Sequence, residues 1–524
     1  MSDPNRTTAV ERRWFLAGLA VLLFGLICYR TAWLCDDAYI TFRTIDNCTN
    51  GFGLRWNVAE RVQAYTHPLW LLLQLPLYAV TRDMYYTSIW LSLVLSVTTI
   101  GLVLRTGATR LWAPLIAVTA LGLSRTFVDY SSSGLENPLT HLLLALFFLL
   151  YWRESHRTGS IFQLALCAGL VILNRLDLVL LVAPPLLFLF WRHRSRRRLG
   201  VLLFGFLPLL LWELFALWYY GFPLPNTAYA KLITGLSSAD LMERGCLYLL
   251  SCCRHDPLAG LLILAGVVAA GWRRHGRWLA CGGGIVLYLI YLVRIGGDFM
   301  AGRLLSPVLL TALFLLLRLG AGASGRQLVA AACLVAIVGL ATPYSPPLTT
   351  ADFGQNRDDI KDSHDVADER AFYYPNTGLL GVSQRTQPND HPWGSNGRRA
   401  LRAGDTPLAK RTIGFFGFFA GPRIHIVDRF GLADPLLARL EPSPTDHWRA
   451  GHLERDLPAG YLEAVVTDAS RISHPELAQY YAKLAVITRG DLGDPKRWRT
   501  ILELNCGVYD HYLEAWAINQ KVRK

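Results

Sequence analysis

Apolar runs separated by short polar stretches fill the chain up to about residue 343. Examples are residues 14–29, 142–152, 201–220 and 284–295. About 20 apolar residues in a helix cross the hydrocarbon core of a bilayer. The pattern therefore predicts a polytopic α-helical membrane protein with about eleven crossings. The segment 67–80, which contains Gln74 and Pro76, is expected to be short, tilted or re-entrant.

The character of the sequence changes after residue 343, where it becomes polar and charged without a spanning run. Residues 411–440 alternate short apolar stretches with Gly, Pro and Asp, which favours buried strands and turns. Residues 474–485 have the period of an amphipathic helix. We therefore expect a membrane domain over 1–343, with a first outer loop at 31–66, and a C-terminal soluble α/β domain over 344–524.

Composition and charge give an orientation. The 524 residues are 52% hydrophobic, and 52 Lys and Arg against 39 Asp and Glu give a net charge of +13. The basic residues gather between apolar runs, at 152–157, 192–198 and 273–277, as in cytoplasmic loops. They lack the aromatic interleaving of a nucleic-acid site, so we predict no nucleic-acid partner. The first outer loop and the C-terminal domain are then expected to lie on the side of the membrane that faces away from the cytoplasm.

Polar residues that interrupt apolar segments fall on this same outer side. Ionisable residues at such positions are functional candidates, and mixed carboxylates and guanidiniums suit binding of an anionic head group and abstraction of a proton. The candidates are Asp36, Asp37, Arg43, Glu136, Asn174, Arg175, Asp177, Asn226, Lys231, Asp298 and Arg303.

The adjacent pair Asp36 and Asp37 is the strongest candidate. Two neighbouring like charges repel, so one of them should have a raised pKa or a cationic partner. Arg43, two helical turns on, is a candidate for that partner. Lys231 has the alternative role of a snorkelling flank residue, and Asp298 that of a turn residue.

Structural alternatives also exist for the candidates further along the chain. Asp177 could pair with Arg175 or Arg303 and lock the fold. Glu136 could be a favourable charge at the start of the helix expected over 139–151.

Longer motifs add a family resemblance. Residues 36–70, "DDAYITFRTIDNCTNGFGLRWNVAERVQAYTHPLW", resemble the first outer loop of GT-C glycosyltransferases, above all the mycobacterial terminal β-(1→2)-arabinofuranosyltransferases and their proteobacterial relatives. His67 and Ala64 depart from that pattern. Later stretches resemble the same family in the same order: "SSGLENPL", "LNRLDLVLL", "PLPNTAYAK", "GGDFMAGRLLSP", "VDRFGLADPLLAR" and "GHLERDLPAGYLE".

The resemblance implies a GT-C fold and transfer of a sugar, D-arabinofuranose first, from a polyprenyl-phosphate lipid donor to a glycan or glycoprotein acceptor. It makes Asp36 and Asp37 catalytic: Asp36 as the base that activates the acceptor hydroxyl, or as a nucleophile if the anomeric configuration is retained. We expect Lys231, Arg303 and Arg175 to bind the donor phosphate. The predicted substrate-binding residues are Arg43, Tyr65, His67, Glu136, Asp177, Asn226 and Asp298. The carboxylate pair could also hold Mg²⁺ or Mn²⁺.

Other classes of protein fit part of the pattern. A hexosyltransferase, such as a mannosyltransferase, would share the fold. A transporter or flippase of a polyprenyl-linked sugar would have intramembrane charges, but near the midplane and in pseudo-symmetric halves. A scaffold that recruits glycan enzymes would not need the aspartate pair.

Overall fold

The computed structural model describes residues 4–106, 111–153, 158–192, 195–349, 360–443 and 448–523. These residues are mostly helical and form two compact units, each assembled from separate parts of the chain. Unit 1 comprises residues 1–35, 85–209 and 238–389, and unit 2 comprises 36–84, 210–237 and 390–524. Residues 154–157 and 193–194, which belong to two of the predicted cytoplasmic loops, lie outside the described residues.

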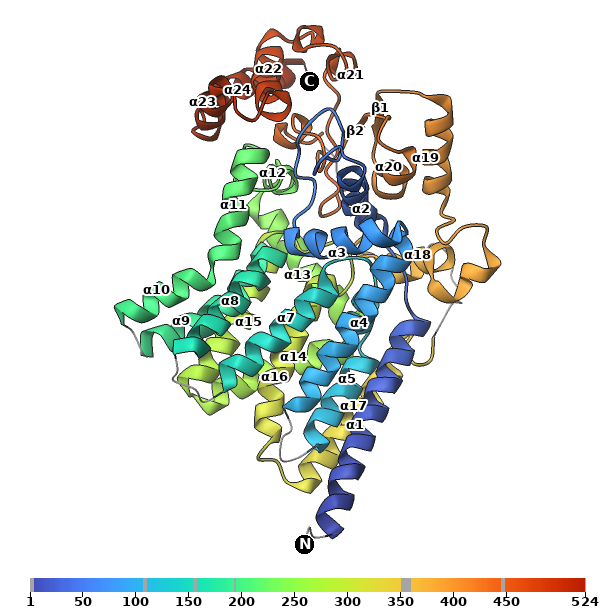
Figure 1. Ribbon diagram of the computed structural model, residues 1–524, viewed down its shortest axis with the longest axis vertical. Coiled ribbons are helices and arrows are strands. Elements are labelled where there is room, and N and C mark those ends of the chain that lie inside the picture. The colour runs from blue at the N-terminus through green and yellow to red at the C-terminus, as the bar shows by residue number, and fades with distance from the viewer. Residues whose placement is uncertain are drawn as a thin grey trace. The chain divides into compact units, whose positions relative to one another are not determined.

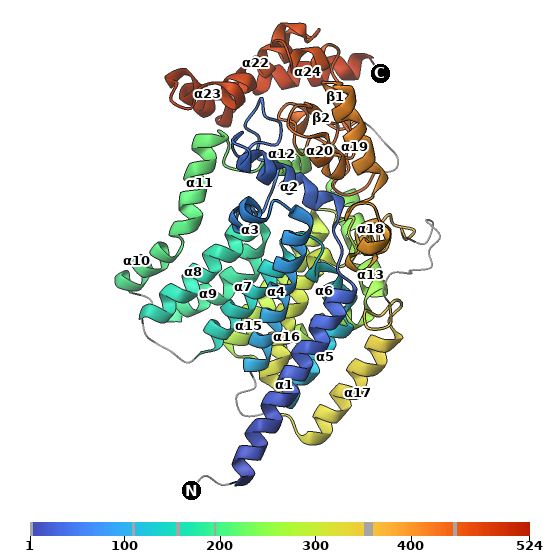
Figure 2. The same ribbon diagram turned by 45° about the vertical axis from the view of Figure 1, so that its right-hand side comes forward.

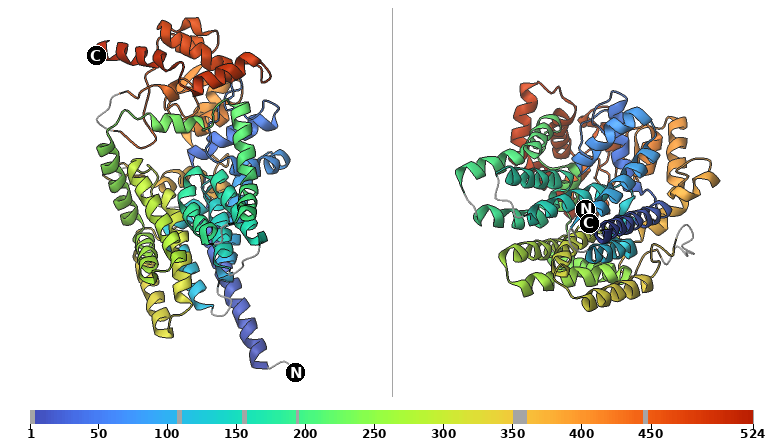
Figure 3. Two further views of the ribbon diagram at one scale, coloured as in Figure 1. Left: turned by 90° about the vertical axis from the view of Figure 1, so that its left-hand side faces the viewer. Right: turned by 60° about the horizontal axis from the view of Figure 1, so that its bottom comes forward.

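Unit 1 is a bundle of apolar helices (Figure 1). Its helices are α1 (Pro4–Arg30), α4 (Met84–Arg105), α5 (Trp112–Leu123), α6 (Arg125–Val128), α7 (Asn137–Trp152), α8 (Thr158–Asn174), α9 (Val179–Arg192), α10 (Arg196–Gly205), α13 (Ser238–His255), α14 (Pro257–Arg273), α15 (Gly276–Arg294), α16 (Ser306–Gly320), α17 (Gly325–Ala341) and α18 (Glu369–Thr377). Figure 2 shows α5 between α1 and α17, and in Figure 3 the yellow-green helices α14, α15 and α16 lie side by side.

Small residues allow the helices of this bundle to approach closely. A Cβ added at Gly266 of α14 would lie 2.7 Å from the Cβ of Ala312 on α16. At Gly245 of α13 it would overlap the backbone of Val293 on α15. Close packing at small residues is how helices associate within a bilayer, where burial of apolar surface from water contributes little between them.

The chain is a multi-pass membrane protein. Within the described ranges four helical segments are long and apolar enough to span a bilayer: Glu11–Arg30, Met84–Arg105, Gly276–Arg294 and Arg303–Gly320. The number rises to six if each of two bent helix pairs, α10 with α11 (Leu207–Tyr219) and α13 with α14, counts as one span. Five further apolar helices are shorter, and α3 (Pro68–Thr81) is one of them. Its 14 residues rise about 21 Å, so the expectation that 67–80 is short is confirmed.

Unit 1 continues beyond residue 343. The amide of Leu379 donates to the carbonyl of Ala32 (2.9 Å), and the amide of Ala367 donates to that of Phe299 (2.7 Å). Residues 360–389 therefore pack on the apolar helices rather than with the rest of the C-terminal part. The predicted assignment of 1–343 to the membrane and 344–524 to the outer side concerns topology and stays a prediction.

Unit 2 combines the first predicted outer loop with the C-terminal part of the chain. Its helices are α2 (Asp36–Thr49), α3, most of α11 (Leu207–Tyr219), α12 (Asn226–Leu232), α19 (Pro392–Ala403), α20 (Gly414–Ala420), α21 (Tyr461–Ala464), α22 (Pro475–Arg489), α23 (Pro495–Asn505) and α24 (Asp510–Arg523). The two strands, β1 (Leu408–Lys410) and β2 (Ile426–Asp428), pair in parallel with Ala409 opposite Val427.

The prediction for residues 411–440 was partly wrong. Residues 426–428 form a strand, but "GFFGFFA" forms the helix α20. Gly414 and Gly417, three residues apart, share a helix face, and that face packs on α2. The amphipathic helix predicted over 474–485 is confirmed as part of α22. Leu477, Tyr480, Leu484 and Ile487 form its buried face.

Candidate functional site

Asp36 lies at the start of α2, and its carboxylate accepts two backbone hydrogen bonds from the start of α20. Phe415 donates to Oδ1 at 2.6 Å, and Gly414 donates to Oδ2 at 3.2 Å. The Asp36 residue is 7% exposed. Unit 2 thus buries a carboxylate on two amides that come from a segment 378 residues further along the chain.

Two glycines make this contact between α2 and α20 possible. A Cβ at Gly414 would overlap the carbonyl oxygen of Asp36, and a Cβ at Gly417 would lie 2.9 Å from the ring of Trp56. Neither position has room for a side chain. The spacing of glycines in "GFFGFFA" therefore serves the close approach of the two helices.

Burial is the main influence on the proton affinity of Asp36. Loss of water contact raises its pKa to about 7, against the lowering effect of the Phe415 amide, while the neighbouring Asp37 raises it further. One member of the aspartate pair therefore has the raised pKa that the sequence predicts. Both protonation states of Asp36 are populated near neutral pH, which suits a general base. Asp37 is half-buried in the first turn of α2.

Arg43 holds the same region together. Its guanidinium donates to the carbonyls of Trp56 (2.8 Å), Ile424 (2.8 Å) and Gly417, and it lies 4.5 Å from the centre of the Trp56 ring. Burial lowers its pKa to about 9. These contacts join α2, the first loop and α20, so in this structure Arg43 has a structural function. Its predicted role in substrate binding stays a prediction.

The other candidates of unit 2 lie in separate surroundings. The hydroxyls of Tyr65 and Tyr220 are 2.8 Å apart, and Nε2 of His67 is 2.8 Å from Oγ1 of Thr41. Tyr65 and His67 lie just before helix α3, Tyr220 directly follows helix α11, and Thr41 lies within α2. Lys231 is exposed in the last turn of α12.

Asn226, at the first position of α12, ties that helix to the segment that follows β2. Its amide donates to the carbonyls of Gly431 (2.8 Å) and Asp434 (3.0 Å), and its oxygen accepts from Arg439 (3.2 Å). The polar atoms of Asn226 are thus engaged within unit 2.

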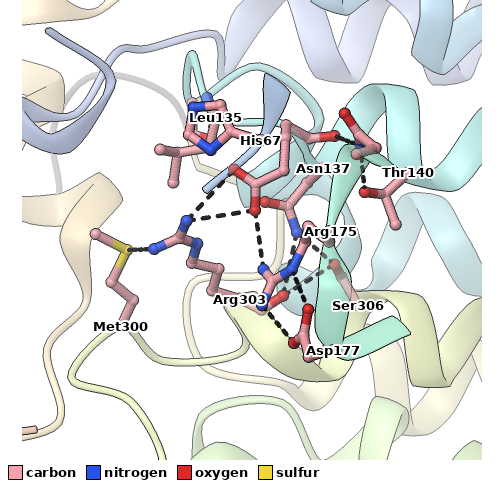
Figure 4. Close-up of polar contacts among 12 residues, drawn as sticks. His67, Leu135, Asn137, Thr140, Arg175, Asp177, Met300, Arg303 and Ser306 are labelled. Carbon is pink, nitrogen blue, oxygen red and sulfur yellow. Dashed lines mark hydrogen bonds and ion pairs between the residues drawn. The ribbon is translucent and has the colours of Figure 1, made fainter. Parts of the chain in front are cut away.

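Four candidates of unit 1, namely Glu136, Arg175, Asp177 and Arg303, form one cluster of ion pairs (Figure 4). Arg175 donates to Oε1 of Glu136 at 2.9 Å and holds both oxygens of Asp177, at 3.0 and 2.6 Å. Arg303 donates to the two oxygens of Glu136 at 3.3 and 3.4 Å. Tyr288 donates to Asp177 at 2.7 Å. Two carboxylates and two guanidiniums balance in charge.

Neutral side chains support this cluster. Asn174 donates to the carbonyl of Glu136 and to Thr140, and Asn137 donates to the carbonyl of Arg303 and to Ser306 (Figure 4). The predicted pairing of Asp177 with Arg175 is confirmed. Asp298 is half-buried and caps the amide of Phe299 at 2.8 Å, as its alternative role as a turn residue predicts.

A second charged cluster of unit 1 was not predicted. Arg370 contacts Asp129 at 2.7 Å, and Arg125 pairs with Asp368. With His255, 3.9 Å from Asp129, the two carboxylates are the one group of three metal-type ligands found within the described residues. Because the guanidiniums already neutralise both carboxylates, a divalent cation would add uncompensated charge there. Arg125 and Asp129 follow the apolar run 112–123, and charges at this position were the sequence signal that could have revealed the cluster.

Two buried carboxylates of unit 2 were also missed. Asp428 accepts from the amides of Phe430 and Ala433, and Asp434 accepts from Leu437 and the hydroxyl of Tyr461. Burial raises the pKa of Asp434 to about 8. Asp428 and Asp434 both lie in "VDRFGLADPLLAR". The motif as a whole resembles the family, but its two carboxylates were not among the predicted site residues.

Comparison with known proteins found similar sequences and a similar structure. No family model matches the chain. The curated terminal β-(1→2)-arabinofuranosyltransferase of Mycobacterium tuberculosis is 30% identical over 350 residues, which cover 58% of this chain and 54% of that protein. The protein of the same name from Corynebacterium glutamicum is 26% identical over 590 residues, which cover 92% and 83%. The chain thus spans about half of the first relative and most of the second.

Among solved structures, ArnT from Cupriavidus metallidurans bound to undecaprenyl phosphate has a TM-score of 0.48 at 12% identity, covering 79% of this chain and 85% of that one. The sequence relatives carry the same name as the family inferred from the motifs. The resemblance is therefore confirmed: this chain is similar in sequence to the curated terminal β-(1→2)-arabinofuranosyltransferases.

Proposed function

We propose that this protein is a membrane glycosyltransferase that moves D-arabinofuranose from a polyprenyl-phosphate donor to an extracytoplasmic glycan or glycoprotein. The observation that carries the proposal is Asp36. It stands in a motif that resembles the first outer loop of GT-C glycosyltransferases, and it is a buried carboxylate whose pKa is raised by burial to about 7. Similarity to a protein of that name over 92% of the chain supports the choice of sugar.

In the proposed reaction Asp36 acts as the general base. An acceptor hydroxyl is a poor nucleophile until a base takes its proton in the transition state. The C–O bond to the donor phosphate breaks as the acceptor oxygen bonds to the anomeric carbon, and the proton goes to Asp36. Asp37 binds hydroxyls of donor or acceptor. A product that keeps the donor's anomeric configuration would instead assign Asp36 as a nucleophile.

The leaving phosphate needs cationic partners, and Lys231, Arg303 and Arg175 are the predicted ones. Arg303 is the better candidate, because its contacts with Glu136 are long (3.3 and 3.4 Å), whereas Arg175 is held by both Glu136 and Asp177. A charge-assisted bond from Arg303 to the phosphate would stabilise the charge that develops on it. Lys231 is exposed on α12, and its share in phosphate binding stays a prediction.

The proposal includes a topology in the bacterial inner membrane. About eleven helices cross, the basic loops face the cytoplasm, and residues 36–70 with a C-terminal outer α/β domain face the periplasm. The described ranges bring no third metal-type ligand to Asp36 and Asp37. A divalent cation, Mg²⁺ or Mn²⁺, at this carboxylate pair stays a prediction that activity with and without a chelator would test.

The decisive experiment is a donor panel. Purified protein in nanodiscs receives labelled polyprenyl-phospho-arabinofuranose, -mannose or -glucose, with membranes of its host as acceptor. We expect label in product from the arabinofuranose donor, and none with the Asp36→Asn/Asp37→Asn double variant. Transfer from a hexose donor alone would correct the sugar. Movement of intact donor across the bilayer without transfer would make the protein a flippase.

A further inference from the structure

Within the described part of the chain, the side chain of Asp36, the proposed base, accepts its hydrogen bonds from two backbone amides of helix α20. We propose that the backbone amides of Gly414 and Phe415 are positioning groups of the transfer reaction, which hold the carboxylate of Asp36 in the orientation that takes the acceptor proton. This inference rests on the function proposed above and deepens it, because it adds a second element to the site.

The two amides fix the carboxylate in both rotation and tilt. Each oxygen of Asp36 accepts one amide, Oδ1 from Phe415 at 2.6 Å and Oδ2 from Gly414 at 3.2 Å. An ionised carboxylate offers about four lone-pair sites. Two donors on different oxygens therefore orient the group and leave acceptor capacity on each oxygen. A misplacement of about 1 Å in such a group can cost about 100-fold in rate.

Helix α20 is itself held rigidly against its neighbours. A Cβ at Gly397 of α19 would overlap the carbonyl of Phe416, and the Arg43 guanidinium donates to the carbonyl of Gly417. The ring of Tyr39, on α2, lies 4.7 Å from that of Phe415. Backbone in close contact on several sides has little freedom to shift, which is what a positioning element requires.

Substitutions at Phe415 can separate the amide from the side chain. Phe415→Ala removes the ring and keeps the N–H, whereas Phe415→Pro removes both. Phe415 is the second residue of α20, where the N–H has no partner within the helix, so proline leaves the helical hydrogen bonds intact. We expect Phe415→Pro to have a kcat at least about tenfold below that of Phe415→Ala, with donor KM values within about twofold of each other.

A thermal unfolding cycle provides a readout that does not need turnover. In detergent, Phe415→Pro should unfold at a lower temperature than Phe415→Ala. In the Asp36→Ala background that difference should fall by at least half, because the acceptor is gone. The same difference in both backgrounds would show that the amide does not hold Asp36.

The outcomes separate this inference from the proposed function. Equal kcat for the proline and alanine variants, beside an active wild type, would overturn the positioning role and leave the transferase proposal standing. A wild type that transfers no sugar from any donor would overturn the proposed function and the catalytic part of this inference, while the unfolding cycle would still decide whether the amide holds the carboxylate.

Discussion

The two units bury carboxylates in different ways. In unit 2, Asp36 accepts from backbone amides, and burial raises its pKa to about 7. In unit 1, Glu136 accepts from the guanidiniums of Arg175 and Arg303. An amide carries a partial charge and a guanidinium a full one, so only the second arrangement compensates the carboxylate. The carboxylate of Asp36 therefore has a proton affinity raised by burial, whereas the charge of Glu136 is balanced by two guanidiniums.

The largest effect on stability is expected where full charges balance. Arg175→Leu would leave Glu136, 1% exposed, and Asp177, 12% exposed, without their shared partner. Breaking a buried pair in this way costs about 3–5 kcal/mol. Thermal unfolding in detergent measures the loss. In the matched control Arg244→Leu, which breaks the more exposed pair with Asp365 in the same unit, the cost should be about 0–1 kcal/mol. Equal losses would show that the cluster is not a buried network.

A smaller loss is expected from Arg43→Lys. Lysine keeps the charge but cannot donate to the carbonyls of Trp56, Gly417 and Ile424 with one planar group. Leaving one or two buried carbonyls unsatisfied should lower the stability by about 1–3 kcal/mol. Unfolding of the purified variant tests this, and an unchanged midpoint would mean that these bonds contribute nothing net.

The pH dependence of turnover tests the backbone-bound carboxylate. A base must be deprotonated to act, and the pKa of Asp36 is raised to about 7. We therefore expect kcat/KM for the donor, which reports groups of the free enzyme, to rise with pH to a plateau above 8, and to fall about tenfold for each pH unit well below 7. The pH profile of kcat/KM measures this. A constant kcat/KM between pH 5.5 and 8.5 would contradict the account.

The sequence predicted one half of the Asp36 site and not the other. The adjacent aspartates, the apolar runs and the helix over 474–485 follow from residue types and their period. The hydrogen-bond partners of Asp36 cannot be predicted from residue types. Every residue except proline has a backbone N–H, so the type of a residue does not show whether its amide donates to a side chain. "GFFGFFA" favoured a strand by composition, and only packing on α2 shows why its glycines are three residues apart.

The second unpredicted feature has a similar cause. Arg125 and Asp368 lie 243 residues apart, and each has an oppositely charged residue much nearer in the sequence, Asp129 and Arg370 respectively. Pairing at this separation depends on how residues 360–389 return to the helices of unit 1. Residue types alone showed that charges were present in apolar surroundings, which is why Glu136, Arg175 and Asp177 were found.

The most direct test compares Asp36→Asn with Glu136→Gln on polyprenyl-phospho-arabinofuranose, with kcat and donor KM measured separately. Asp36→Asn should lower kcat by about 10²–10⁴-fold and leave the donor KM within about twofold, as expected for loss of a general base. Glu136→Gln, which disturbs Arg175 and Arg303, should act mainly on the donor KM. Near-normal kcat in Asp36→Asn would contradict the assignment of Asp36 as the base.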